Sequence, residues 1–342
     1  MSDELLTSVL KRLVAGETLS TEDATFVFAT MMEGTVSHAR IAAILTAMAM
    51  RGPAIEEIIG GARALRSHAV KVDVPDNAID MCGTGGDNHG TLNVSTAASF
   101  VVAACGVPVA KHGNRAMSSR TGAADVLESL GVALNLKEGG IQSCFREAGL
   151  CFLFAQAHHP AMRHVGPVRK ELGFRTIFNL LGPLSNPAGV RRQLLGVFDG
   201  AWTEPLAHTL QALGTEKAWV VHGSDGLDEI TIAGTTSVAA VENGSVRTFE
   251  IMPEKAGLLR LPLNEIKGGT PDENASAIRA TLDGAPGAFR EIVLLNAAAA
   301  LLIADKCENL RDGAQLAASA IENGSALQAL DKLVAVSRSF AT

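Results

Sequence analysis

From about residue 72 onward, short apolar segments that favour strands alternate with segments that favour helices. Helices of about ten residues between such strands are typical of βαβ units, in which the helix returns the chain to begin the next strand in the same direction. We therefore expect an α/β fold with a mostly parallel central sheet flanked by helices. The strand candidates are Ala78–Cys82, Val107–Ala110, Cys151–Ala157, Gln193–Phe198 and Ala218–His222, and helix candidates between them include Ser95–Cys105, Ala123–Leu130 and Gly140–Ala148.

The first seventy residues have a different pattern, which is helical throughout. Apolar residues from Leu5 to Leu13 recur at i, i+3 and i+4, the stripe of an amphipathic helix. Ser20 precedes an acidic turn and can cap a second helix. Gly52-Pro53 then separates a third helix from a fourth. A further helical stretch, Pro160–Leu184, interrupts the alternating part of the chain.

From residue 236 onward, a hairpin signal is followed by helices. Alternating apolar residues flank Glu242-Asn243-Gly244, and an Asn-Gly pair between such segments predicts a tight turn between two antiparallel strands. Long helices are expected around Ile292–Ala304, Leu316–Ile321 and Leu327–Val336.

Composition excludes several classes of protein. The chain has 342 residues, 47% hydrophobic and 19% charged, which is typical of a globular protein and not of a disordered one. A net charge of −7 argues against a nucleic-acid-binding surface. The five cysteines include no C-x-x-C pair, so buried free thiols are expected and a thiolate metal site is not. The start Met1–Glu4 is acidic where a signal peptide is basic, and no apolar run suits a membrane span; we expect a soluble, cytoplasmic protein.

A glycine-rich segment follows the first strand candidate. Gly83-Thr84-Gly85-Gly86-Asp87 lies between that strand and the segment that starts the next helix. Glycines at such a place let backbone N–H groups approach an anion closely, and the helix dipole adds to the attraction. The run matches neither a Walker A loop nor a G-x-G-x-x-G fingerprint. Alone, it is equally consistent with a plain tight turn.

Two neighbouring segments favour a phosphate-binding function. Asn93–Thr96 places three short polar side chains at a predicted helix start, more than capping requires, although one of them can serve as an ordinary N-cap. Lys111–Gly122 contains three cations, two serines and two glycines just beyond a strand candidate, the edge at which open α/β sheets bind ligands. The alternative for this second segment is a solvated basic loop.

In this order and spacing, these segments resemble the anthranilate phosphoribosyltransferases. The resemblance rests on Gly83–Asp87, Asn93–Thr96 and Lys111–Asp125, and it extends through His159–Gly173, Asn179–Leu184 and Asp225–Glu229 to cover essentially the whole chain. Departures from the family pattern at Cys82, Asn88-His89, Leu92 and Met117 remove no polar group that the chemistry requires.

The resemblance implies a fold, an assembly and a reaction. A small helical domain of residues 1–70 and about 160–187 would lie beside a large α/β domain of residues 71–159 and 188–342. The protein would form a homodimer through the helical domain. As a pentosyltransferase it would transfer a ribose phosphate from 5-phosphoribosyl 1-diphosphate (PRPP) to the amino group of anthranilate. Diphosphate would be released, in an early step of tryptophan synthesis that needs Mg²⁺.

The resemblance also implies roles for individual residues. No general base is assigned, because the aromatic amine of anthranilate is already neutral at pH 7. The metal ligands would be Ser95, Asp228 and Glu229. Anthranilate would be bound by Gly83, His112, Asn114 and Arg169, with the backbone of Gly113. PRPP would be bound by Gly83, Gly86, Asp87, Thr91, Asn93, Ser95, Thr96, Lys111 and Ser119.

Physical chemistry agrees with these roles but leaves alternatives open. Mg²⁺ takes one or two carboxylates together with substrate phosphates, yet an adjacent pair such as Asp228-Glu229 is also common in surface turns. Strand geometry would point the two side chains apart, so a turn must hold them together. The guanidinium of Arg169 matches a carboxylate in a bidentate fashion, although it could equally belong to a helix surface. We expect the two substrates to meet between the domains, with hinge closure.

Two other functions are compatible with parts of the pattern. A pyrimidine nucleoside phosphorylase shares the Lys-His-Gly start, but Asn114-Arg115, Arg169 and Asp228-Glu229 favour the anthranilate enzyme. A non-catalytic relative that binds nucleic acid is disfavoured by the acidic balance and by the full set of site residues.

Overall fold

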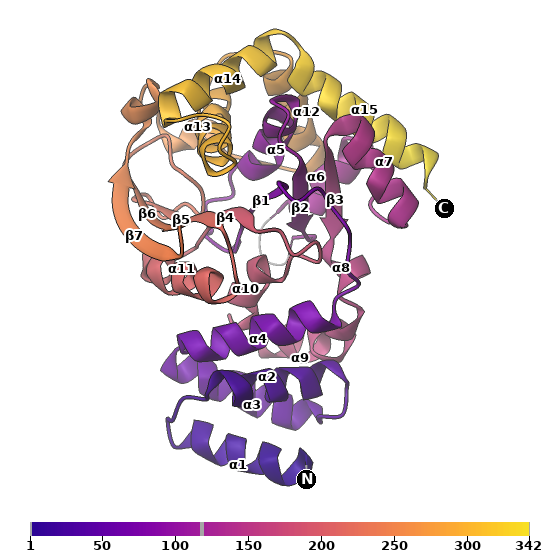
Figure 1. The fold of residues 1–342 in the computed structure, drawn as a ribbon, viewed down its shortest axis with the longest axis vertical. Coiled ribbons are helices and arrows are strands. Elements are labelled where there is room, and N and C mark those ends of the chain that lie inside the picture. Colours follow the sequence, from indigo (N-terminus) through magenta and orange to yellow (C-terminus); the bar gives the residue numbers. More distant parts are fainter. Residues whose placement is uncertain (1, 117–119, 342) are drawn as a thin grey trace.

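The computed structural model describes residues 2–116 and 120–341, which form a helical part and a larger α/β part (Figure 1). The helical part contains α1 (Ser2–Val14), α2 (Thr21–Met32), α3 (His38–Arg51) and α4 (Ile55–His68). Two later elements return to it: η1 (Pro160–His164) packs on α2, and α9 (Gly166–Leu172) packs on α3. The short elements α10 (Phe178–Leu181) and η2 (Pro183–Ser185) pack on α4, so the 160–185 segment lies along the N-terminal helices.

Local chemistry explains the start and the crossing of these helices. The Ser20 hydroxyl accepts a hydrogen bond from the Asp23 N–H at 3.1 Å and caps α2, as the sequence predicts. The buried Glu57 carboxylate accepts hydrogen bonds from the N–H groups of Leu19 and Ala54 at 2.9 and 2.8 Å, which fixes the start of α4. A Cβ on Gly60 would lie 2.6 Å from the Cβ of Ala24, so only glycine permits this close approach of α2 and α4.

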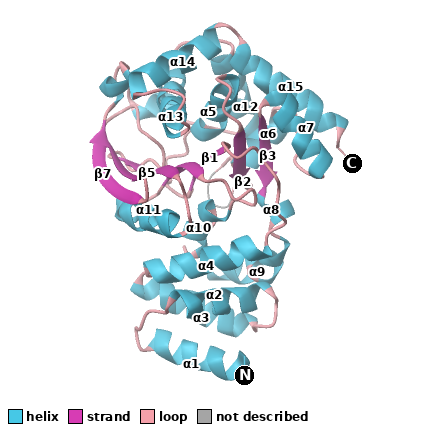
Figure 2. Cartoon of the chain, in the orientation of Figure 1, coloured by secondary structure: helices cyan, strands magenta, loops and turns pink. Residues whose placement is uncertain are grey.

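The α/β part is built on one seven-stranded sheet of order β3-β2-β1-β4-β5-β6-β7. Neighbouring strands pair in parallel from β3 through β2, β1 and β4 to β5, whereas β6 pairs antiparallel with β5 and β7 pairs antiparallel with β6. Figure 2 shows the strands between two layers of helices. The strands are β1 (Ile79–Gly83), β2 (Val109–Gly113), β3 (Leu150–Phe154), β4 (Arg192–Gly196), β5 (Lys217–Gly223), β6 (Thr236–Glu242) and β7 (Ser245–Ile251).

The helices of this part cover both faces of the sheet. On the side facing the helical part lies α11 (Thr203–Ala212), near α10 (Figure 2). On the other side and around the edge lie α5 (Val94–Ala104), α6 (Ala123–Ser129), α7 (Glu138–Ala148), α12 (Pro271–Leu282), α13 (Ala288–Ile303), α14 (Leu310–Glu322) and α15 (Ser325–Ser339). Short connections are α8 (Ala155–His158), η3 (Gly200–Trp202), η4 (Pro253–Ala256) and η5 (Leu263–Ile266).

Two hydrophobic cores follow from the alternation of side chains along the strands. On β4, Leu194 packs into the core shared with α5 and α13, whereas Leu195 packs into the core shared with α11 and the helical part. The second core runs without interruption from Val9 of α1 to Val220 of β5. The helical part is therefore joined to one face of the sheet by continuous apolar packing.

The structure confirms the predicted fold class and hairpin and corrects some boundaries. Asn243 and Gly244 both have positive φ (51° and 70°), as the tight Asn-Gly turn requires. The second strand, however, runs from Val109 to Gly113 and therefore includes Lys111 and His112. The third strand ends at Phe154, where the chain enters α8.

Two further expectations concern the cysteines and membrane spans. All five cysteines are free thiols; three are buried, whereas Cys105, which follows the end of α5, and Cys307, in the loop between α13 and α14, are half-buried. Within residues 2–116 and 120–341, no helix is both long enough and apolar enough to cross a membrane.

Candidate active site

The predicted phosphate loop lies where the sheet order reverses. From β1 the chain passes outward to β2 and β3 and then returns to β4 on the other side of β1. In parallel sheets, the loops after two such neighbouring strands diverge and leave a crevice at their carboxyl ends. Gly83 ends β1 and Gly196 ends β4, and the two residues pair in register. The crevice therefore opens beside the Gly83–Asp87 loop.

The acidic pair Asp228-Glu229 faces this loop and the start of α5. Asp228 Oδ2 accepts a hydrogen bond from the Gly85 N–H at 2.7 Å. Glu229 Oε1 accepts one from the Ser95 N–H at 3.1 Å, in the first turn of α5. The two carboxylates thus point toward the two segments that were predicted to hold phosphate, and the turn is not an ordinary surface turn.

Glycines and a buried amide hold the acidic turn in place. A Cβ on Gly83 would lie 2.4 Å from Asp228 Oδ2, and one on Gly196 would lie 1.6 Å from the Asp228 carbonyl oxygen. On the other side, fully buried Asn296 of α13 accepts a hydrogen bond from the Ile230 N–H at 3.1 Å and donates one to the Ile230 carbonyl at 2.9 Å. The turn is therefore clamped between the ends of β1 and β4 and helix α13.

The electrostatics of this pair fit a divalent cation. Burial, followed by the negative charges of Asp87 and Glu229, raises the pKa of Asp228 well above its usual range. Burial also raises the pKa of Glu229 to about 7, against the opposing effect of Lys111. Carboxylates brought together in this way are stabilised by a hard cation, and oxygen ligands are those Mg²⁺ prefers.

A metal ion at this turn would receive only part of its coordination shell from the protein. Among the described residues, no group of three or more His, Cys, Asp or Glu side chains is placed to enclose a metal ion. Oxygen atoms from a ligand such as a phosphate would therefore have to complete the coordination, as is usual for Mg²⁺.

Lys111 lies beneath the loop and not in an exposed basic segment. Its ammonium donates hydrogen bonds to the Met81 carbonyl at 2.6 Å and to Ser95 Oγ at 3.2 Å. Burial lowers the pKa of Lys111, while the nearby Asp80 and Glu229 carboxylates oppose that shift. Burial also disfavours the charged form of Asp80 and therefore raises its pKa. The alternative of a solvated basic loop fails at this residue, because β2 carries the lysine into the interior.

The polar residues before and within α5 are differently placed. Asn93 occupies the N-cap position, but its side chain makes no capping bond; its Oδ1 accepts from Asn274 Nδ2 at 2.9 Å. Within the described ranges, the buried Thr96 hydroxyl has no hydrogen-bond partner. Thr91 forms an isolated bridge with Lys267. Ser119 lies outside the described residues.

His112 and Asn114 lie at the end of β2 beside a second histidine. The ring centroids of His112 and His159 are 5.3 Å apart, and both Nε2 atoms are buried without a partner among residues 2–116 and 120–341. Burial lowers the pKa of His112 to about 3 and that of His159 to about 4, so both rings are neutral. Asn114 Oδ1 accepts from the Arg115 N–H at 2.8 Å, and a Cβ on Gly113 would lie 2.9 Å from the ring of Phe152.

Arg169 is held in the helical part. It lies on α9, with its guanidinium carbon 5.2 Å from the ring centroid of Phe178, and burial lowers its pKa. No carboxylate in the described part of the chain pairs with it. No hydrogen bond between described residues joins it to the phosphate loop, so the structure does not bring it into contact with the acidic pair.

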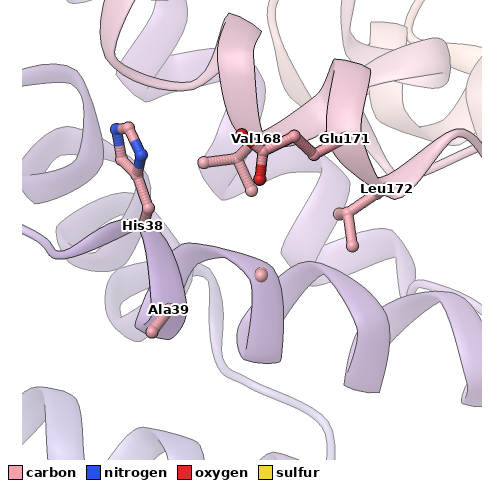
Figure 3. Close-up of a pocket in the computed structure, with 6 residues that line it drawn as sticks. His38, Ala39, Val168, Glu171 and Leu172 are labelled. Atoms are coloured by element: carbon pink, nitrogen blue, oxygen red, sulfur yellow. The ribbon is translucent and has the colours of Figure 1, made fainter.

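Helix α9 also borders a groove on the helical part (Figure 3). The groove has a volume of about 310 Å³ and lies between α3 and α9, away from the sheet edge. Val168 and Glu171 line it from one side, and His38 lies across from them (Figure 3).

Two further residues near the site were not predicted from the sequence. Arg175, between α9 and α10, donates a hydrogen bond to the Gly86 carbonyl and stacks on Phe198, with 4.1 Å from its guanidinium carbon to the ring centroid. No periodicity marks this arginine. Asn296 carried a signal, since it is a lone amide in the apolar run Ile292–Ala304. A polar side chain at such a position must find partners, because an unpaired buried amide is costly.

Comparison with known proteins adds a separate line of support. The model for the helical bundle domain of a glycosyl transferase family matches residues 7–69, and that for the a/b domain of the same family matches residues 75–327. The anthranilate phosphoribosyltransferase of Beijerinckia indica subsp. indica is 55% identical over 328 residues, 96% of each chain.

Solved structures give the same result. The crystal structure of anthranilate phosphoribosyltransferase from Thermus thermophilus has a TM-score of 0.91 at 44% identity and covers 96% of this chain and 99% of its own. The enzyme from Saccharomyces cerevisiae in complex with PRPP and Mg has a TM-score of 0.89 at 28% identity and covers 98% of each chain. The full-length similarity in sequence and the shared fold show that this chain belongs to the anthranilate phosphoribosyltransferase family.

Proposed function

We propose that this chain catalyses the Mg²⁺-dependent transfer of 5-phosphoribosyl from PRPP to the amino group of anthranilate, with release of diphosphate, as a step of tryptophan biosynthesis. The observation that carries the proposal is the acidic turn: Asp228 and Glu229 bond to the N–H groups of Gly85 and Ser95, in the two segments that would hold phosphate. The yeast relative in complex with PRPP and Mg supports the choice of substrate and metal.

The leaving group sets the first chemical task. Attack at an anomeric carbon passes through an oxocarbenium-like state, so the charge of the departing diphosphate must be stabilised. Backbone N–H groups of the glycine loop and the Lys111 ammonium would meet this charge. Mg²⁺ would be held by Ser95, Asp228 and Glu229, and when bound it would neutralise part of the phosphate charge. PRPP would be bound by Gly83, Gly86, Asp87, Thr91, Asn93, Ser95, Thr96, Lys111 and Ser119.

The acceptor sets the second task, which is orientation. A neutral aromatic amine needs no prior deprotonation, so holding it in line accounts for much of the rate. Arg169 would bind the anthranilate carboxylate, since its guanidinium has no acidic partner among the described residues. The neutral His112 ring, with Asn114 and the backbone of Gly83 and Gly113, would line the position of the ring. No residue is assigned as a base.

The domain boundaries belong to the same proposal. Residues 1–70 and about 160–187 would move as the helical unit, and residues 71–159 and 188–342 as the α/β unit. The packing of α9 on α3 and of η1 on α2 supports the assignment of the 160–187 segment. Closure between the units would bring Arg169 toward the phosphate loop.

We also propose a homodimer that is formed through the helical part. Val14 and Met50, at the C-terminal ends of α1 and α3, are 74% and 85% exposed, and the groove between α3 and α9 adds a concave surface at the N-terminal end of α3. Exposed apolar side chains that gather on one part of a protein favour an interface. Light scattering after gel filtration should give twice the chain mass of 35.6 kDa; a monomer at micromolar concentration would contradict the proposal. The cytoplasmic location and the absence of nucleic-acid and membrane partners stay predictions.

Loss of anthranilate fluorescence tests the function directly. Enzyme, PRPP and Mg²⁺ together should remove the signal, and omission of any one should preserve it. Folded protein that leaves the fluorescence unchanged would refute the proposal. Phosphorolysis of thymidine or uridine is the corresponding test for a nucleoside phosphorylase, and we expect none.

A further inference from the structure

Arg175 extends from the segment after α9 to the phosphate loop. Its Nη2 donates a hydrogen bond to the Gly86 carbonyl, and a Cβ on Gly86 would lie 3.3 Å from the same nitrogen. The guanidinium carbon lies 4.1 Å from the centroid of the Phe198 ring, two residues beyond the end of β4. The cation is thus held at the loop that would receive the diphosphate.

The charge of Arg175 is not balanced by an acid. Other arginines of the α/β part, such as Arg115 and Arg192, form ion pairs with two carboxylates each. Among residues 2–116 and 120–341, Arg175 has neither a carboxylate partner nor a hydrogen-bond acceptor other than the Gly86 carbonyl. A guanidinium has five N–H donors in a planar fork, so most of its capacity stays open to a ligand.

The ring beneath the guanidinium limits its freedom. Stacking on Phe198 restricts the orientation of the fork while leaving its edges accessible, because Arg175 is exposed. A side chain that is already oriented loses less entropy when it binds an anion. A neutral carbonyl is a weaker partner for a guanidinium than a phosphate oxygen is. Replacing the hydrogen bond to the Gly86 carbonyl by one to a phosphate oxygen is therefore favoured.

We propose that Arg175 is a further diphosphate-binding residue of the active site, which exchanges the Gly86 carbonyl for oxygen atoms of the PRPP diphosphate. This inference rests on the proposed function. No covalent step is involved, and the contact would lower the energy of the departing diphosphate. Because Arg175 lies beside α9 and α10, which pack on the helical part, the contact would also link that part to the bound phosphate.

The test compares Arg175→Gln and Arg175→Lys with wild type. The control is Arg63→Gln, which removes the same charge from an exposed position on α4. The measurements are the affinity for inorganic diphosphate with Mg²⁺ by calorimetry and the KM values for PRPP and anthranilate. Arg175→Gln should weaken diphosphate binding and raise the KM for PRPP by about tenfold or more, the usual effect of losing a charged hydrogen bond. The KM for anthranilate and all values for Arg63→Gln should stay near wild type.

The conservative variant separates binding from a purely structural role. Arg175→Lys should give intermediate diphosphate affinity, because it keeps the charge and loses the fork. Arg175→Gln with wild-type diphosphate affinity would overturn the inference, whether or not its melting temperature falls. If wild type turns over PRPP and anthranilate in that case, the proposed function stands. Wild type without turnover would refute the function, while the calorimetry still tests the Arg175 contact.

Discussion

Gly196→Ala tests whether the position of the acidic turn decides activity. Gly196 ends β4 and has ordinary negative φ, so its backbone accepts alanine without strain. The added methyl group, however, would lie 1.6 Å from the Asp228 carbonyl oxygen and 2.4 Å from its carbonyl carbon. The obstacle is backbone, which cannot rotate away as a flexible side chain does.

The size of the effect follows from the required displacement. Ordinary van der Waals contact begins at 3.4 Å, so the Asp228 carbonyl must move by about 1.8 Å relative to β4. Asn296 holds Ile230 on the far side, so the strain falls on the bonds to Gly85 and Ser95. Misplacement by about 1 Å can lower activity by about 100-fold, and overpacking costs about 1–3 kcal/mol of stability.

The assay is the rate of anthranilate fluorescence loss across a Mg²⁺ titration, with thermal unfolding measured in parallel. We expect kcat/KM to fall by about 100-fold or more and the Mg²⁺ requirement to rise, while the protein still folds. Gly139→Ala is the matched control, because its Cβ in the first turn of α7 meets no atom within 4 Å. A Gly196→Ala enzyme with wild-type kcat/KM and Mg²⁺ dependence would refute the reasoning that this turn must be held in place.

Three further changes probe the acceptor, the metal and the buried histidines. Arg169→Ala should raise the KM for anthranilate far more than that for PRPP, and an unchanged anthranilate KM would remove Arg169 from the site. Asp228→Asn with Glu229→Gln should sharply weaken Mg²⁺ dependence and PRPP use; a normal Mg²⁺ titration would mean that the pair has only a structural role. The third change concerns pH. His112 and His159 have a pKa of about 3 and about 4 in the folded protein, below the ordinary 6.5, so only the unfolded state takes up their protons below pH 6.5. As the pH falls from 6.5 to 5, each histidine should therefore lower the free energy of unfolding, with a slope that grows from about 0.7 toward about 1.4 kcal/mol per pH unit. Urea unfolding of His159→Asn should show a shallower pH dependence than wild type, and equal slopes would contradict this account.

The periodic features of the fold follow from local patterns of residues. The stripe from Leu5 to Leu13 predicted a helix, and the apolar segments beginning near Ala78 predicted parallel strands. Such patterns are local, since a helix or a strand must bury one face whatever lies opposite. The Asn243-Gly244 turn is local in the same sense, because those two residues accept positive φ.

Which distant residues meet depends on packing across the whole fold. Strand β2 continues beyond its apolar residues to include Lys111 and His112. Their polar groups can be buried because the Met81 carbonyl accepts a hydrogen bond from the Lys111 ammonium and the Asp80 carboxylate accepts one from the His112 N–H. No periodic pattern in the sequence indicates these contacts. The Asp228-Glu229 pair, which follows β5, faces the phosphate segments only because β1, β4 and β5 are neighbours in the sheet, which brings residues 143 positions apart into contact. Sequence patterns report the period of an element, whereas the order of strands and the chemistry it brings together are settled by packing.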